Sequence, residues 1–212
     1  MGMFLRRGLD TRRKVHDLAP GTVIKLPSSG GNVDFFISKH NYEAALNGPG
    51  RTLVVRRYLN TPPGGMTFGS SRNYKTSNID TWFNGDYFNL FGADMKAKIG
   101  TTTFYCYDKD SSAVTTLTRS VFTPSMAELG FSETYAPVEG SALPNAADLL
   151  IAASHGANRV HWTRTCSTSG TKYVYAITEA GVAATYRYST SQYLQPCFTI
   201  PGNMVITDDM LA

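Results

Sequence analysis

The sequence predicts an α+β fold in which short helices pack on small antiparallel sheets. Short runs of β-branched and aromatic residues recur between turns rich in Gly, Pro and Asn. One early segment, residues 77–99, instead has the apolar spacing of helices. The chain has 212 residues, of which 42% are hydrophobic, enough for one domain with a full core. We therefore expect an N-terminal arm over residues 1–17 and one domain over residues 18–212.

The arm is basic, with five Lys or Arg residues against Asp10 in its first 14 positions. Since the whole chain carries a formal charge of +4, the rest is close to neutral, and nucleic acid is not an expected partner. An apolar cluster beside a charge run is typical of a segment that docks onto a neighbouring subunit. The candidate assembly residues are Phe4, Arg6, Arg7, Arg12, Arg13 and Lys14.

The first strands are expected at residues 22–26 and 33–38, as a hairpin with a loop longer than two residues over 27–32. A third strand is expected at 52–58, after a Gly- and Pro-rich turn. Further strand candidates are 103–107, 113–117, 160–163, 172–178, 182–188 and 197–200. A turn at 179–181 would join two of them as a hairpin.

Helices are expected at 78–84, with Ser77 as N-cap, and at 93–99, where Gly100 ends the helix. The aromatic residues of this region are interpreted as core. Ser125 and Glu128 have the spacing of a capping box, which predicts a short helix ending at Gly130. Residues 146–153 fit either one helical turn or a buried strand.

Catalytic and metal-binding signatures are missing from the sequence. We find no HExxH, CxxC, GxSxG or phosphate-loop pattern, so no enzyme, cofactor or metal is expected. Three cysteines, Cys106, Cys166 and Cys197, lack metal spacing and are interpreted as buried thiols rather than a disulfide framework. No signal peptide or membrane-spanning segment is expected.

The segment 159–201 has the composition of a binding face. Its ends are apolar, whereas its interior is rich in Ser, Thr, Tyr, Ala and Gly, which suits adaptable contacts. An ordinary solvent-facing sheet is the alternative, because strands favour Tyr and Thr anyway. Alternation puts Tyr173 and Tyr175 on one face, in part as core. Tyr186, Tyr188 and Tyr193 lie near the predicted loops and are the better candidates for exposure. The candidate ligand-binding residues are Ser167, Thr168, Ser169, Thr171, Tyr186, Tyr188, Ser189, Thr190, Ser191 and Tyr193.

Four blocks, in order, resemble a domain-of-unknown-function family found in phages of gut Firmicutes and in bacterial surface proteins. The blocks are PGTVIKL (20–26) with FFI (35–37); Tyr74, Ser77, Ile79, WFN (82–84), Phe88, LF (90–91) and Ile99; VFTPS (121–125) with ELGF (128–131); and HWTRTC (161–166) with LQPCFTIP (194–201). The chain departs from the family where Thr165 and Cys166 replace Ser-Pro, and where Gln195 replaces the arginine before Pro196.

This resemblance implies a C-type-lectin-like fold and a phage virion protein, assembled in the host cytoplasm, that displays a face for host or surface adhesion. It would bind a host surface protein or glycan without calcium, contact other virion proteins through the arm and form a homo-oligomer, for which a trimer is one form. The alternatives are an architectural head-decoration or tail component without a ligand and, more distantly, an oxidase of the formylglycine-generating type. Residues 165–193 contain no Asn, and their composition also resembles that of retroelement-diversified regions.

Overall fold

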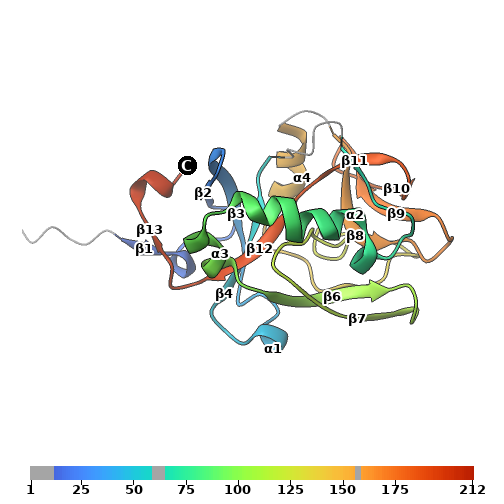
Figure 1. The fold of residues 1–212 in the computed structure, drawn as a ribbon, viewed down its shortest axis with the longest axis horizontal. Coiled ribbons are helices and arrows are strands. Elements are labelled where there is room, and N and C mark those ends of the chain that lie inside the picture. The colour runs from blue at the N-terminus through green and yellow to red at the C-terminus, as the bar shows by residue number, and fades with distance from the viewer. Residues whose placement is uncertain (1–11, 59–64, 156–158) are drawn as a thin grey trace, which may run out of the picture.

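Four small sheets organise the computed structural model, which describes residues 12–58, 65–155 and 159–212 (Figure 1). Two of these sheets have four and five strands, and the other two are two-stranded. Short helical segments lie beside them, so the predicted α+β class is confirmed. Within these ranges, no helix is long and apolar enough to span a bilayer.

The four-stranded sheet has the order β12-β4-β3-β2, and all of its neighbouring strands are antiparallel. Its strands are β2 (Val23–Ser28), β3 (Gly31–His40), β4 (Arg51–Arg56) and β12 (Cys197–Pro201). All four strands were predicted, but the prediction of a long loop between β2 and β3 was wrong. Pairing continues through Pro27 with Asn32 to Ser28 with Gly31. Because β2 is an edge strand, Pro27 can take part although it has no N–H to donate.

The five-stranded sheet has the order β10-β9-β8-β11-β5. Its strands are β5 (Met66–Thr67), β8 (His161–Cys166), β9 (Tyr173–Ile177), β10 (Ala183–Arg187) and β11 (Ser191–Leu194). β8 and β11 are parallel, and the other pairs are antiparallel. The hairpin of β9 and β10 was predicted, whereas β5 and β11 were missed because both are short and polar.

β8 contains a wide bulge, because Trp162 pairs with Ala176 whereas Cys166 pairs with Val174. Three residues of β8 therefore stand opposite Tyr175 alone. Such an excess bends a strand and redirects its side chains. All six residues of β8 are buried, which an ordinary alternating strand on the surface would not give.

The helical segment in green in Figure 1 begins at Ser77, whose Oγ accepts the N–H of Asp80 at 3.0 Å. α2 (Asn78–Trp82) continues as a π turn (Phe83–Tyr87) and a 3-10 turn (Phe88–Leu90). α3 (Ala93–Ile99) has the predicted bounds, and Gly100 follows it with a φ of +59°.

The remaining helices are short. α4 (Ala146–His155) decides between the two alternatives for this region in favour of a helix, and α1 (Ala44–Asn47) was not predicted. 3-10 turns cover Val15–Asp17, Tyr74–Thr76 and Asp208–Met210. The helix predicted to end at Gly130 was wrong. Its capping box forms, but Gly130 has a φ of +84° and Phe131 N–H bonds Met126 O at 3.0 Å, which closes the segment after one turn.

The two-stranded sheets lie at the edges of the molecule. β6 (Thr102–Asp108) and β7 (Ala113–Arg119), both predicted as strands, pair as an antiparallel hairpin. β1 (Arg13–Lys14) pairs with β13 (Val205–Ile206), and Val15, which follows β1, is fully buried. The last residues of the predicted arm therefore pack on the domain. Arg12, Arg13 and Lys14 are exposed, while Phe4, Arg6 and Arg7 lie outside the described residues.

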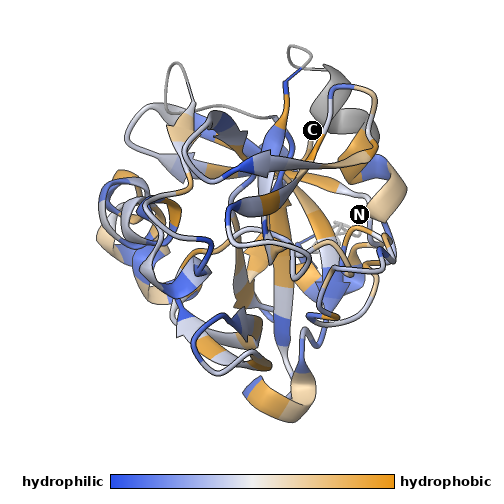
Figure 2. Ribbon diagram, turned by 90° about the vertical axis from the view of Figure 1, so that its right-hand side faces the viewer, coloured by the Kyte–Doolittle hydropathy of each residue, from blue (hydrophilic) through white to orange (hydrophobic). Residues whose placement is uncertain are grey.

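The core fills the space between the two larger sheets and the helical segment. Figure 2 shows hydrophobic residues gathered along the central strands and more polar residues in the surrounding loops. Phe122 lies at the centre, with its ring 4.2 Å from that of Phe104 and 5.8 Å from that of Tyr42. The expectation of core aromatic residues in this region is confirmed for Phe83 and Phe91, whereas Trp82 and Phe88 are only partly buried and pack against the core.

Candidate binding face and its buried frame

The two segments predicted to bind a ligand meet at one end of the five-stranded sheet. The loop 167–172 joins the end of β8 to the start of β9, and Arg187, at the end of β10, pairs with Tyr173. The next residue, Tyr188, donates its N–H to Lys172 O at 3.0 Å. The loop 167–172 and the turn 188–190 are therefore neighbours.

Most of the predicted Ser and Thr residues are exposed. The exposed ones are Thr168, Ser169, Thr171, Ser189, Thr190 and Ser191. Ser167 is only 1% exposed, because its backbone continues the pairing of β8 with β9: Ser167 N–H donates to Tyr173 O at 3.1 Å. Ser191 lies on β11 opposite Thr67, away from the loop of Thr168.

The expectation of exposed tyrosines was wrong for Tyr186, Tyr188 and Tyr193, which are all half-buried. The ring of Tyr186 stands edge-on at 6.4 Å from that of Trp162, and Tyr188 also packs against the core. Tyr193 pairs with the first residue of β8 and therefore lies at the other end of that strand from the 167–172 loop.

Two exposed tyrosines stand in their place. Tyr175 is core, but Tyr173 is 38% exposed, and Tyr135, at 53%, comes from a distant loop. Thr168 joins this loop to the face, because its N–H and Oγ1 donate to Tyr135 O at 2.8 and 3.0 Å. Residues 131–144 have no periodic pattern, so the sequence carries no signal for this contact. We call Tyr135, Thr168, Ser169, Thr171, Tyr173, Ser189 and Thr190 the polar face.

Arg72 holds the loop of the polar face in place. Its Nη1 donates to Ser167 O and to Gly170 O, so one guanidinium bridges the two ends of a tight turn. Arg72 lies nearly a hundred residues before this loop in the sequence, which is why sequence reasoning missed it.

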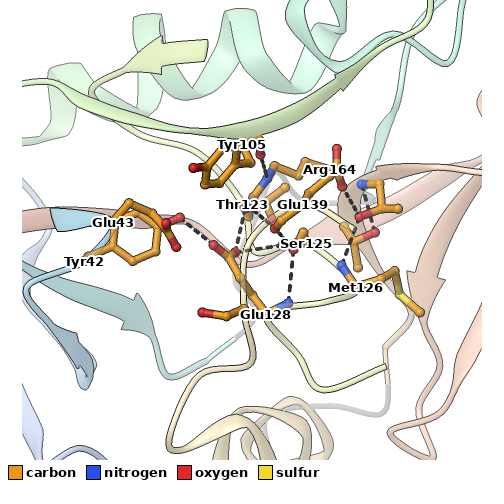
Figure 3. Close-up of polar contacts among 12 residues, drawn as sticks. Tyr42, Glu43, Tyr105, Thr123, Ser125, Met126, Glu128, Glu139 and Arg164 are labelled. Atoms are coloured by element: carbon orange, nitrogen blue, oxygen red, sulfur yellow. Dashed lines mark hydrogen bonds and ion pairs between the residues drawn. The ribbon is translucent and has the colours of Figure 1, made fainter. Parts of the chain in front are cut away.

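Behind the face lies a buried polar network centred on Arg164 (Figure 3). The β8 bulge directs this side chain into the core, where its Nη1 is 2.6 Å from Glu128 Oε2, and both side chains are fully buried. Nη1 also donates to Thr123 O at 2.8 Å, Nη2 to Glu139 O at 3.1 Å and Nε to Tyr105 O at 3.0 Å. All three guanidinium nitrogens thus have acceptors, as a buried charge requires.

Glu128 is equally well satisfied. Its Oε1 accepts the hydroxyl of Tyr42 at 2.5 Å, and its Oε2 accepts the N–H of Ser125 at 3.0 Å. Ser125 Oγ in turn accepts the N–H of Glu128 at 3.1 Å, so the predicted capping box is confirmed. The carboxylate of Glu128 thus has two roles, since it caps this turn and is also the counter-ion of Arg164.

A second buried carboxylate, Glu139, links the network to β8. It accepts the hydroxyl of Thr165 and the N–H of Tyr107, the latter at 2.6 Å. Thr165 stands where the resemblance places a serine, and its Oγ1 also accepts the N–H of Met126 at 3.0 Å. The departure at Thr165 therefore keeps a hydroxyl in contact with the network.

Burial and charge set the protonation of this network. Burial is the largest single effect and lowers the pKa of Arg164, but the interactions with Glu128, Tyr42 and Glu139 together outweigh it, and the net pKa is well above the usual value. Burial raises the pKa of Glu139, against the opposing effect of Arg164. Burial, with the adjacent Glu128, also raises the pKa of Tyr42. This phenol therefore keeps its proton and donates a hydrogen bond to Glu128. These groups are saturated with internal partners and form a rigid support rather than a reactive centre.

The expectation of buried thiols is confirmed, since Cys106, Cys166 and Cys197 are all buried and free. Burial raises the pKa of each thiol, to about 12 for Cys166. Thiolates are the nucleophilic form, so none of these groups is activated. Among the described residues, no group of three or more His, Cys, Asp or Glu could hold a metal ion.

Native protein is therefore expected to react very slowly with a thiol reagent such as Ellman's reagent at pH 8, because the thiols are buried and protonated. Unfolding in guanidinium chloride should release all three cysteines for rapid reaction. Absorbance of the released thiolate measures both rates. Rapid labelling of one cysteine in the folded protein would contradict the expectation.

The fold and the site define a mixed α+β protein that presents a polar face on a buried charged frame. A model of the domain-of-unknown-function family DUF6273 matches residues 49–202, and the chain belongs to this family. Neither a curated protein nor a solved structure matches the chain.

Gln195, which stands where the resemblance places an arginine, is fully buried, and neither amide atom has a hydrogen-bond partner among the described residues.

Proposed function

We propose that the protein is a non-enzymatic binding module, a virion surface protein of a phage with a C-type-lectin-like fold whose polar face attaches to a host surface protein or glycan. The observation that carries the proposal is that exposed tyrosines lie beside a loop held in place by hydrogen bonds. Tyr135 and Tyr173 offer aromatic area with a polar tip, and the neighbouring hydroxyl groups offer adaptable hydrogen bonds. Arg72 and the backbone of Tyr135 fix the 167–172 loop, which bears several of these hydroxyl groups. A loop that is already ordered loses less conformational entropy on binding.

The assembly part of this proposal concerns the chain's beginning. Arg12, Arg13 and Lys14 lie at the exposed edge beside β13, and the arm that precedes them would contact other virion proteins and help to build a homo-oligomer. The same exposed ribbon favours the second candidate, an architectural head or tail component. Val205, on β13, is 42% exposed, which suits a contact with another subunit.

An oxidase of the formylglycine-generating type is disfavoured, since its chemistry needs a reactive cysteine and these thiols are buried with raised pKa values.

The double variant Tyr135→Ala plus Tyr173→Ala tests the face. We expect at least a tenfold loss in the binding of fluorescently labelled protein to cells of the phage's host, because both aromatic anchors are removed. Val114→Ala is the matched control, since Val114 is 39% exposed on the separate β6–β7 hairpin. Equal binding by all three proteins would contradict the proposed face.

Immunogold electron microscopy of intact particles tests the location independently. Label on the particle surface is expected. Labelled particles that adsorb normally when the double variant replaces the natural protein would favour the architectural alternative, whereas unlabelled particles would overturn a virion protein of either kind.

A further inference from the structure

Arg56, the last residue of β4, is a buried cation without a counter-ion. The residue is only 9% exposed, and it has no carboxylate within ion-pair distance among the described residues. Within the described ranges, its Nε has no hydrogen-bond partner, and its Nη1 reaches only Tyr87 Oη at a long 3.4 Å. Arg164, which is buried more deeply, has every nitrogen occupied and Glu128 as its counter-ion.

Tyr87 does not compensate this charge. Its hydroxyl is a neutral phenol, because burial raises its pKa to about 12 against the opposing effect of Arg56. Its ring lies 5.8 Å from the guanidinium carbon, which adds a weak cation–π attraction. Since Arg56 has so few partners, its charge is poorly compensated, and an anion beside it would be stabilising.

A cavity provides the space for such an anion. Its volume is 470 Å³, and it lies between the β2–β3 hairpin, the end of β4 and the turns around Tyr87 and Leu90, with Arg56 in its wall. The volume is in the range of small-molecule sites, about 300–1,000 Å³. Tyr58 and Leu90 line it and are 38% and 41% exposed, so the cavity opens to solvent.

The walls of this cavity differ in chemistry. Hydroxyl and amide groups come from the hairpin, at Ser28, Ser29 and Asn32, whereas Leu90 and Phe91 form an apolar side. Asp34 also lines the cavity, where its carboxylate can accept hydrogen bonds from hydroxyl groups. Arg57 lies 3.5 Å from Asp34 and offsets that charge. A ligand that fits therefore has one anionic group, several hydroxyls and a ring with an apolar face.

We propose that this cavity binds a sugar acid, a pyranose with a single carboxylate that pairs with the guanidinium of Arg56. The guanidinium of Arg56 lines the cavity, and a guanidinium donates strong, charge-assisted hydrogen bonds to a carboxylate. The ring stacks on the apolar wall, and its hydroxyls contact the hairpin and Asp34. Inorganic phosphate fits less well, since its second charge would face Asp34.

This site is separate from the polar face. It lies on the four-stranded sheet and the turns of residues 83–91, whereas the polar face belongs to the end of the five-stranded sheet. Binding of a ligand in this cavity can therefore be tested separately from the proposed adhesion of the polar face.

Titration calorimetry of the full chain with glucuronate, galacturonate and N-acetylneuraminate tests the site, with glucose, galactose and phosphate as comparison ligands. We expect saturable binding of at least one sugar acid and none of the neutral sugars. Arg56→Met should weaken that binding at least tenfold without lowering the melting temperature, because it removes a buried charge that lacks a partner. Arg187→Met, which removes the same charge from an exposed position on β10, should bind as the natural protein does.

Leu90→Glu keeps the test decisive if Arg56→Met does not fold. Leu90 is exposed at the mouth, so a carboxylate there should leave the fold intact and repel the ligand. Amide shifts on binding should appear at Gly30 and Asn32 and not at Thr168 or Tyr173. The site is overturned if no sugar acid binds, if phosphate or a neutral sugar binds as well as the acids, or if Arg56→Met or Leu90→Glu folds and binds normally.

Discussion

Glu128→Ala is expected to lower the free energy of unfolding by about 3–5 kcal/mol, because it leaves a buried arginine without its counter-ion. Arg164 is 1% exposed, and its contact with Glu128 measures 2.6 Å. The same substitution removes the acceptor of the Tyr42 hydroxyl and the capping bond to Ser125 N–H. Urea unfolding followed by circular dichroism gives the difference.

A surface ion pair provides the control. Lys75 is 2.8 Å from Asp108, but its side chain is 36% exposed, so Lys75→Ala should destabilise the protein far less than Glu128→Ala does. The interpretation of the buried network as the frame of the fold requires a clear difference between the two variants. Equal losses, or a loss below about 1 kcal/mol for Glu128→Ala, would refute it.

Trp162→Ala is expected to cost about 3–5 kcal/mol as well, through a different mechanism. The side chain is fully buried, its indole N–H donates to Met66 O at 2.9 Å, and its ring meets Phe68 edge-on at 5.6 Å. Its removal leaves a large cavity and deprives the half-buried Tyr186 of its packing partner. Urea unfolding with detection by circular dichroism again measures the effect, since tryptophan fluorescence differs between the variants.

The chain's second tryptophan is the matched control. Trp82 packs on Tyr87 at 5.3 Å but is only partly buried, so Trp82→Ala should cost less than about 2 kcal/mol. The ranking is the decisive result. A greater loss from Trp82→Ala would mean that the helical segment, rather than the five-stranded sheet, holds the core together.

Local patterns predicted much of the fold. The hairpins of β2 with β3 and of β9 with β10 were predictable because each is encoded by β-branched runs beside a turn. The bounds of α3 followed from its apolar spacing and from Gly100. β11 was not predictable, since its pairing with β8 depends on residues about thirty positions away and its own sequence is short and polar.

The site was less predictable than the fold, for the same reason. The Ser and Thr residues of the 167–172 loop were found by composition, but the exposed Tyr135 and the bonds of Arg72 arise only when distant segments meet. Tyr186 was misjudged because its position near a loop did not show that its ring would pack on the buried Trp162. Arg56 gave no sequence signal at all, since one arginine at the end of a strand is ordinary until its burial is known.

The bulge in β8 has a consequence for how this family can vary in length. Arg164 meets Glu128 only because three residues bulge out opposite Tyr175, so gaining or losing one residue between Trp162 and Cys166 would rotate the guanidinium away from its carboxylate. The loop just beyond, 168–172, is bonded to Arg72 and Tyr135 rather than to Arg164 or Glu128. Substitutions of its exposed side chains should therefore leave the buried network intact, so that the surface can be remodelled while the domain beneath stays unchanged.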